Sequence, residues 1–308
     1  MPKEFKETFP ECVKCGYIPC INLFKSWDEL EGEELFLLSE SIRRGKVIPC
    51  IIGVPIYTLC QCTRVLAKNE ETANLPIVVV LHQCIRDLKC STFLALCGHY
   101  RNAMQILRPL LENFLAGLYF TYTETPTDFQ KWIQGDYKIP ASLYESITGE
   151  KSNKKRYDLD WKFCLMYFIK HAVREEYRKR WMRRMARIRE KIIAPLNKYL
   201  HARFEVFEIA SPEKCAECPA SVKYDKEWFD KWIEITQRIL YIIFEYLLAA
   251  FGDKLIENEQ SREALFMLTH PIEVERELHK QFLKYEEYRK LIKLINEAIE
   301  EYEKTKTK

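Results

Sequence analysis

The sequence predicts an all-α protein, a multi-helix bundle of about nine helices that follows an irregular, cysteine-containing N-terminal segment. Apolar residues recur at helical spacing through most of the 308 residues, and capping residues or glycines stand where these periods begin and end. The chain contains only 9 Gly and 13 Pro, which suits long helices with few tight turns.

Composition limits the class of protein further. With 47% hydrophobic and 30% charged residues, the chain resembles neither a disordered nor a membrane protein. Its apolar runs are too short to span a bilayer and its start lacks a secretory signal, so we expect a soluble, cytoplasmic protein without membrane partners. Abundant Lys, Glu and Arg with little Gln is typical of a thermophile.

The expected helices follow from local signals along the chain. A capping box at Ser26 begins the first helix, which ends at Gly45. Next come a helix over 48–67 with Pro55 near its first turn or at a kink, a helical stretch over 74–123 that breaks near Gly98, and two short helices that end at Gly135 and Gly149. They are followed by a long helix over 160–193, another over 196–204, and a helix capped by Asp225 that ends at Gly252.

Three regions are expected: residues 1–25 as the irregular segment that docks on the body, 26–252 as the helical bundle, and 253–308 as a C-terminal helical extension. In the extension, apolar residues recur every seven positions, for example at Ile292 and Ile299. We expect this stripe to pack on the body of the same chain, and the alternative is a helix of a protein partner.

Two cysteine pairs predict a structural zinc site. Cys12 and Cys15 form one pair, and Cys215 and Cys218 form the other. Together they supply the four thiolates of a closed site, which leaves no position for a reactive water. Cys20 is a competing ligand, and disulfides or free thiols remain alternatives, because intracellular proteins of hyperthermophiles can carry disulfides.

A basic segment predicts a nucleic-acid interface. Residues 151–191 contain 15 Lys or Arg and five Asp or Glu, a local net charge of +10, whereas the whole chain carries +3. Its densest part interleaves cations with an aromatic ring: Arg178, Arg180, Trp181, Arg183, Arg184 and Arg187. Such a stripe can neutralise phosphates and stack bases. The alternative is a solvated helix face that pairs with acidic surface elsewhere.

The third candidate site lies on the stretch 97–112, which reads CGHYRNAMQILRPLLE. Arg108 and Glu112 are four residues apart, so they share one helical face among leucines, and charges on such a face need partners. His201 follows a later helix. The three residues are interpreted either as a polar network that fixes helix register or as a pocket in which Arg108 binds an anion and His201 moves a proton.

These motifs resemble a loose group of uncharacterised helical proteins in the HEPN and abortive-infection-like neighbourhood. The resemblance covers about residues 81–201 and implies that Arg108, Glu112 and His201 converge inside a helical bundle. HEPN ribonucleases carry Arg four to six residues before His, whereas this chain has Asn197 four residues before His201, and Pro109 also departs from the pattern. Ribonuclease chemistry is therefore not implied.

Three functions remain open at this point. The first is a zinc-stabilised binding module for nucleic acid or a protein partner, with a role in defence. The second is a divergent, HEPN-like, RNA-directed nuclease. The third is a structural or small-ligand-binding protein.

The zinc prediction can be tested by elemental analysis. Purified protein should contain about one zinc per chain, and the double variant Cys215→Ser, Cys218→Ser should lose it, because two thiolates hold the ion far less tightly than four. Metal-free wild-type protein whose thiols titrate freely would rule the shared site out.

Overall fold

The structure, a computed structural model, describes residues 52–123, 125–151, 154–173, 175–200, 225–269 and 286–306. It confirms the all-α prediction, because these residues are almost entirely helical. The elements in chain order are α5 (Val54–Lys68), α6 (Pro76–Leu96), α7 (Tyr100–Thr121), α8 (Pro126–Ile133), β1 (Ile139–Pro140), α9 (Ala141–Thr148), β2 (Arg156–Tyr157), α10 (Trp161–His171), α11 (Glu175–Ile188), the π-helical turn η3 (Arg189–Ile193), α12 (Ala194–Leu200), α14 (Lys226–Glu257), α15 (Glu259–Thr269) and α17 (Glu286–Lys306).

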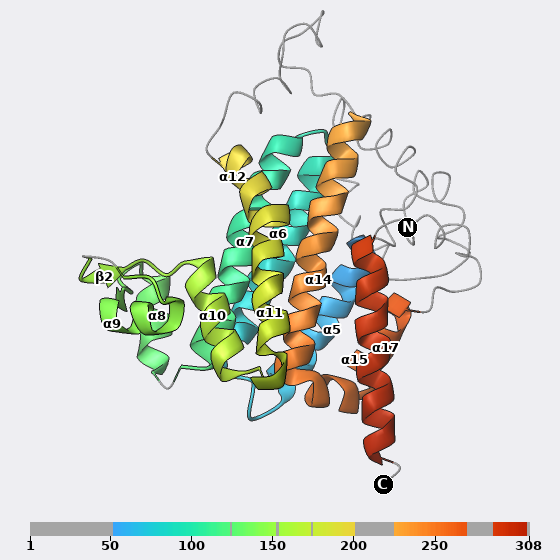
Figure 1. Cartoon of the computed structure of the whole chain (residues 1–308). Helices are drawn as coiled ribbons and strands as arrows, with labels where there is room; N and C mark the ends of the chain where they lie inside the picture. Colours follow the sequence, from blue (N-terminus) through green and yellow to red (C-terminus); the bar gives the residue numbers. More distant parts are fainter. Residues whose placement is uncertain are drawn as a thin grey trace, which may run out of the picture.

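The centre of the bundle is the antiparallel pair α6 and α7 (Figure 1). The chain turns between them at Gly98, which adopts a positive φ of 80°, as expected from the predicted break. Farther along α7, Gly117 lies against Val80 of α6 so closely that a Cβ atom at this position would stand 2.9 Å from the Cβ of Val80. The missing side chain therefore sets how closely the two helices approach.

Helix α14 covers this pair on one side. Its first turn is capped by Asp225, whose Oδ1 accepts hydrogen bonds from the backbone N–H of Glu227 and Trp228. The buried Trp232 donates from its indole Nε1 to Ser91 Oγ of α6 at 3.0 Å. The helix continues beyond the predicted end at Gly252, but it kinks there, at Phe251, where φ is −138°.

Helices α10 and α11 correct one expectation. The sequence predicted a single helix over 160–193, whereas the chain turns after His171 and α11 packs back against α10 (Figure 1). No Gly or Pro marks this turn. Arg178 stabilises it instead, because its guanidinium donates to the backbone oxygens of Lys170 and Val173 at the end of α10.

A small unit formed by α8, β1, α9 and β2 stands at one side of the bundle, beside α10 (Figure 1). The two short strands pair antiparallel, with Ile139 opposite Tyr157. Gly149 ends α9 with a φ of 72°, as the sequence predicts. This unit supplies one wall of the pocket described below.

The C-terminal helices pack on the same chain. Thr58 of α5 donates a buried hydrogen bond to the backbone oxygen of Ala264 in α15. Ile295 of α17 is fully buried, and Ile299 packs against the core. The described part of the seven-residue stripe therefore contacts the body of its own chain. The predicted segment 1–25 and the predicted helix from Ser26 lie outside the described residues.

The contact between Gly117 and Val80 predicts a stability effect. Gly117→Ala should lower the free energy of unfolding by about 1–3 kcal/mol in urea titrations, because the added methyl group overlaps a stiff β-branched side chain. Adding Val80→Ala should restore part of the loss. The matched control is Gly252→Ala, where a Cβ meets nothing within 4 Å, and equal losses in both single variants would contradict the explanation.

Candidate functional site

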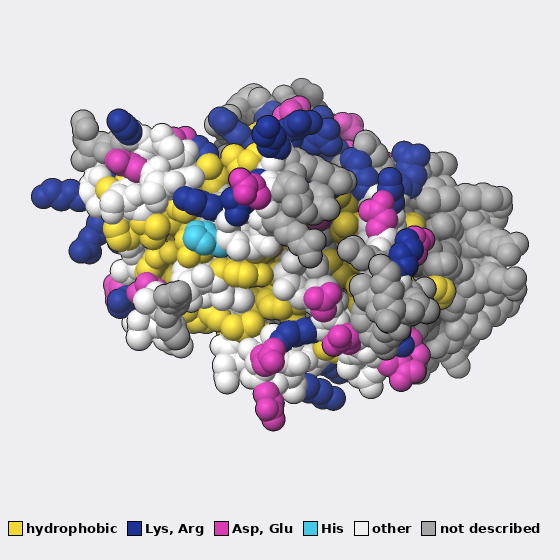
Figure 2. All heavy atoms as spheres, turned by 60° about the horizontal axis from the view of Figure 1, so that its bottom comes forward, with side chains coloured by type: hydrophobic (Ala, Val, Ile, Leu, Met, Phe, Trp, Pro, Cys, Tyr) yellow, Lys and Arg dark blue, Asp and Glu magenta, His cyan; other side chains and the backbone are white. Residues whose placement is uncertain are grey.

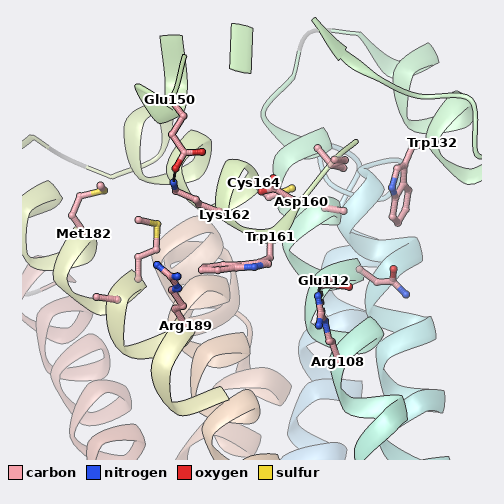
Figure 3. A pocket seen from close by; sticks show the side chains of 15 residues that line it. Arg108, Glu112, Trp132, Glu150, Asp160, Trp161, Lys162, Cys164, Met182 and Arg189 are labelled. Atoms are coloured by element: carbon pink, nitrogen blue, oxygen red, sulfur yellow. Dashed lines mark hydrogen bonds and ion pairs between the residues drawn. The ribbon is translucent and has the colours of Figure 1, made fainter. Parts of the chain in front are cut away.

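A pocket of about 910 Å³ opens between four parts of the fold (Figure 3). Its walls come from α7, from α8, from the start of α10 with the residues before it, and from α11 with the first residue of η3. The lining residues used below are Arg108, Glu112, Trp132, Glu150, Asp160, Trp161, Lys162, Cys164, Met182, Met185 and Arg189. Pockets of this size and mixed apolar and polar lining are typical of ligand sites.

The α7 wall carries the charged pair that the sequence singled out. Arg108 donates from Nε and Nη2 to a single carboxylate oxygen of Glu112, Oε1, at 3.1 and 2.9 Å. The side chains are 16% and 35% exposed, respectively. Among the described residues, Nη1 of Arg108 is buried without a partner and Glu112 Oε2 accepts no hydrogen bond. The pair is therefore rigidly held and retains hydrogen-bonding capacity.

The α10 wall is organised by its N-cap residue. Asp160 Oδ1 accepts from the backbone N–H of Phe163 at 2.8 Å, and Oδ2 accepts from the hydroxyl of Tyr144 at 3.0 Å. Both carboxylate oxygens are thus engaged in structure. They fix the first residue of the helix, Trp161, whose half-buried indole lies across the pocket between Arg189 and Glu112 (Figure 3).

The pocket lining contains the thiol of Cys164. Cys164 is buried, and its burial raises the pKa of the thiol well above its ordinary value. The nearby carboxylates of Asp160 and Glu112 raise this pKa further, because they disfavour a thiolate. The thiol form of Cys164 is therefore favoured over the thiolate that covalent catalysis requires.

The rim carries further charges. Lys162 and Glu150 form an ion pair at the mouth of the pocket (Figure 3). Arg189, by contrast, is exposed and has no ion pair or hydrogen bond with any described residue. Its guanidinium is therefore accessible to an anion that enters the pocket.

Helix α11 presents three distinct faces, because successive residues turn by about 100°. The core face carries Trp181, Arg184 and Ile188. The pocket face carries Met182, Met185 and Ala186. The third face points to solvent and carries Lys179, Arg183 and Arg187, each four residues after the last.

The core face accounts for two residues of the predicted basic stripe. Trp181 is only 9% exposed and its ring meets that of Tyr246 edge-on, with centroids 4.7 Å apart. Arg184 forms an ion pair with Glu245, whose side chain is 3% exposed, and lies 5.6 Å from the Trp181 ring. Buried groups of this kind hold the helix in place, and Trp181 is not exposed in this structure for a base to stack on.

The remaining residues of the stripe separate into two groups. Arg178 is used at the end of α10, and Arg180 lies in α11 with a side chain outside the described set. Arg183 and Arg187 are exposed, and neither has a partner among the described residues. Lys and Arg side chains gather along the upper edge and the left end of the molecule in Figure 2, with hydrophobic side chains exposed between them.

Lys179 and Arg189 belong to the dense basic part of the sequence but were not among the predicted binding residues, and Trp132 and Trp161 were not predicted as members of the site. The helical phase of α11 could have selected the two cations: Trp181, Arg184 and Ile188 are spaced three and four apart, so they share one face, and the other cations must lie elsewhere on the helix. The two tryptophans come from separate elements, and the sequence holds no signal that brings them together.

Other predicted site residues lie outside the described residues: His201 and the four cysteines Cys12, Cys15, Cys215 and Cys218. Helix α12, which precedes His201, ends against α7, where Gln105 Nε2 donates to the backbone oxygen of Tyr199 at 3.1 Å. Within the described ranges, no three His, Cys, Asp or Glu side chains are grouped so that they could hold a metal ion.

None of the helices in the described ranges combines the length and the apolarity needed to cross a bilayer. Comparisons of the chain with protein families, with curated proteins and with solved structures found no match. The chemistry of the pocket and of α11 therefore carries the functional argument.

The core face of α11 predicts a second stability effect. Arg184→Met should lower the free energy of unfolding by about 3 kcal/mol, because it leaves the carboxylate of Glu245 buried without its cation. Combining Arg184→Met with Glu245→Leu should recover most of this loss. Arg183→Met, next in sequence but exposed, should change stability by no more than about 0.5 kcal/mol. A similar loss for both arginines in urea titrations would contradict the assignment of the faces.

Proposed function

We propose that this protein binds single-stranded nucleic acid along the solvent face of α11, with the adjoining pocket as part of the interface. The observation that carries the proposal is a row of exposed cations, Lys179, Arg183 and Arg187, that have no partners among the described residues and lie on the same helix as a wall of the pocket lined by Trp161.

The row is well suited to a phosphate backbone. Residues four apart on a helix are separated by about 6 Å along its axis, so each cation can meet a different phosphate. Exposed cations that form no ion pair need not break one to bind a strand. Arg189 lies apart from this row, in the lining of the pocket, and the surrounding segment 151–191 carries a net charge of +10.

The pocket favours a single strand over a duplex. Bases stacked inside a duplex cannot reach a recessed aromatic side chain, whereas unpaired bases can. Trp132 already stacks on Phe129, with centroids 5.8 Å apart. Trp161 has no aromatic partner among the described residues and is available to a base.

The remaining parts of the proposal come from the sequence. The zinc site at the two cysteine pairs acts as a structural clamp, and the HEPN-like resemblance supports a role in defence. The composition of the chain supports a location in the cytoplasm. A divergent nuclease is the competing function. It is favoured by the position of α12, because its end contacts α7 one turn before Arg108.

Titration of a fluorescently labelled, unstructured RNA strand at rising salt tests the proposal. Binding should weaken with salt, and the double variant Arg183→Ala, Arg187→Ala should reduce the slope of log K against log[salt] by about 1.4, because two phosphate contacts are lost. The matched control is Arg86→Ala, Lys89→Ala, which removes two exposed cations from α6 and should leave the slope unchanged.

Three results would contradict the proposal: no salt-dependent binding, equal losses in the two double variants, or equally tight binding of a duplex. Gel analysis of the RNA in the same samples distinguishes a binding module from an enzyme. Intact RNA supports a binding module. Cleavage that disappears in His201→Ala would replace it with the nuclease.

A further inference from the structure

We propose that the pocket holds one unpaired guanine base, with Glu112 accepting hydrogen bonds from its Watson–Crick edge and Trp161 stacking on its face. The inference deepens the proposed function and rests on it for the source of the base, a strand bound along α11. It names the base that the pocket selects.

The Glu112 carboxylate is held in one orientation by Arg108. Arg108 binds a single oxygen of this group through two N–H donors, at 3.1 and 2.9 Å, and so fixes its orientation. The other oxygen accepts no hydrogen bond from the described residues, and the side chain is 35% exposed where it lines the pocket. A carboxylate held in this way is a pre-organised acceptor.

The Glu112 carboxylate restricts which base can bind in the pocket. An ionised carboxylate only accepts hydrogen bonds, so it selects a base edge that offers donors side by side. Guanine presents such a pair in N1–H and the exocyclic N2–H₂. Adenine and cytosine place one donor beside a ring nitrogen acceptor, and uracil places its single N–H between two carbonyl oxygens. An acceptor that faces Glu112 would be repelled, so guanine fits best.

The space around the Glu112 carboxylate can hold a base and its phosphate. Trp161 lies between Glu112 and Arg189 in Figure 3, so a base that bonds to Glu112 can lie against the indole while its phosphate turns towards Arg189. Met182 and Met185 line the side formed by α11, and a volume of about 910 Å³ accommodates a nucleotide.

Helix α11 carries both a wall of the pocket and the row of exposed cations. Met182 and Met185 lie on the face of α11 next to the one that carries Arg183 and Arg187. Arg189 lines the pocket itself, so a strand that runs from Arg183 and Arg187 to Arg189 brings one nucleotide to the pocket, where its base can turn inward.

The experiment compares oligouridine strands that differ only at one central position, which is guanine, adenine, cytosine, uracil or hypoxanthine. Wild-type protein should bind the guanine strand about tenfold more tightly than the adenine strand, as expected for a two-donor contact. Hypoxanthine lacks the N2 amino group and should lose most of this preference. Anisotropy at constant salt measures each affinity, and the comparison needs no variant to fold.

Glu112→Gln should lower the affinity for the guanine strand to that for the adenine strand, because an amide presents one acceptor and one donor group. Trp161→Ala should weaken all strands that carry a purine at the central position. The matched control is Glu234→Gln, which removes the carboxylate of another helical Glu–Arg pair four residues apart, with Arg238 on α14. It should preserve the guanine preference.

Equal binding of the five strands by wild-type protein would overturn the inference, as would a guanine preference that survives Glu112→Gln or is lost equally in Glu234→Gln. Salt-dependent binding without base preference would leave the strand proposal intact and remove the guanine pocket. Titration with free guanosine monophosphate separates the opposite case: quenching of tryptophan fluorescence without strand binding would keep the pocket and remove the strand.

Discussion

The ion pair between Arg184 and Glu245 sets the rotation of α11, and the arrangement of the candidate site depends on it. Glu245 is buried in α14, so it requires a cation at one fixed position. Trp181 adds a second anchor one turn earlier, against Tyr246. Because a helix is rigid about its axis, fixing this face also fixes the direction of the other two. Met182 and Met185 then face the pocket, and Arg183 and Arg187 face solvent.

The arginines of α11 therefore have three different roles within one short helix. Arg178 donates to the carbonyl oxygens that end α10, Arg184 neutralises a buried carboxylate, and Arg183 and Arg187 remain exposed and unpaired within the described set. Position on the helix decides which role applies, since each cation meets whatever lies on its own face. A net charge summed over the segment overstates the number of cations that a phosphate backbone can use.

Local signals were sufficient for most of the fold. Pro55 in a first turn, Asp225 as a cap and Gly149 with positive φ all stand where the sequence predicts an end of a helix. The turn after His171 was not predictable in this way, because an arginine side chain from the next helix stabilises it. The Arg108–Glu112 pair follows from spacing alone. The pocket beside it does not, since its walls come from four elements that only tertiary packing brings together.

The two parts of the proposed interface rely on different physical forces, although they share one helix. Contacts between phosphates and Arg183 or Arg187 gain most of their free energy from released counterions, so they weaken as salt is added. The proposed stacking on Trp161 and hydrogen bonds to Glu112 would form within the pocket and depend less on salt. Affinity for a strand and choice of a base are therefore separate properties of this surface. In the proposed interface the row of cations would hold many sequences, while the Glu112 carboxylate, held by Arg108, would select the base in the pocket.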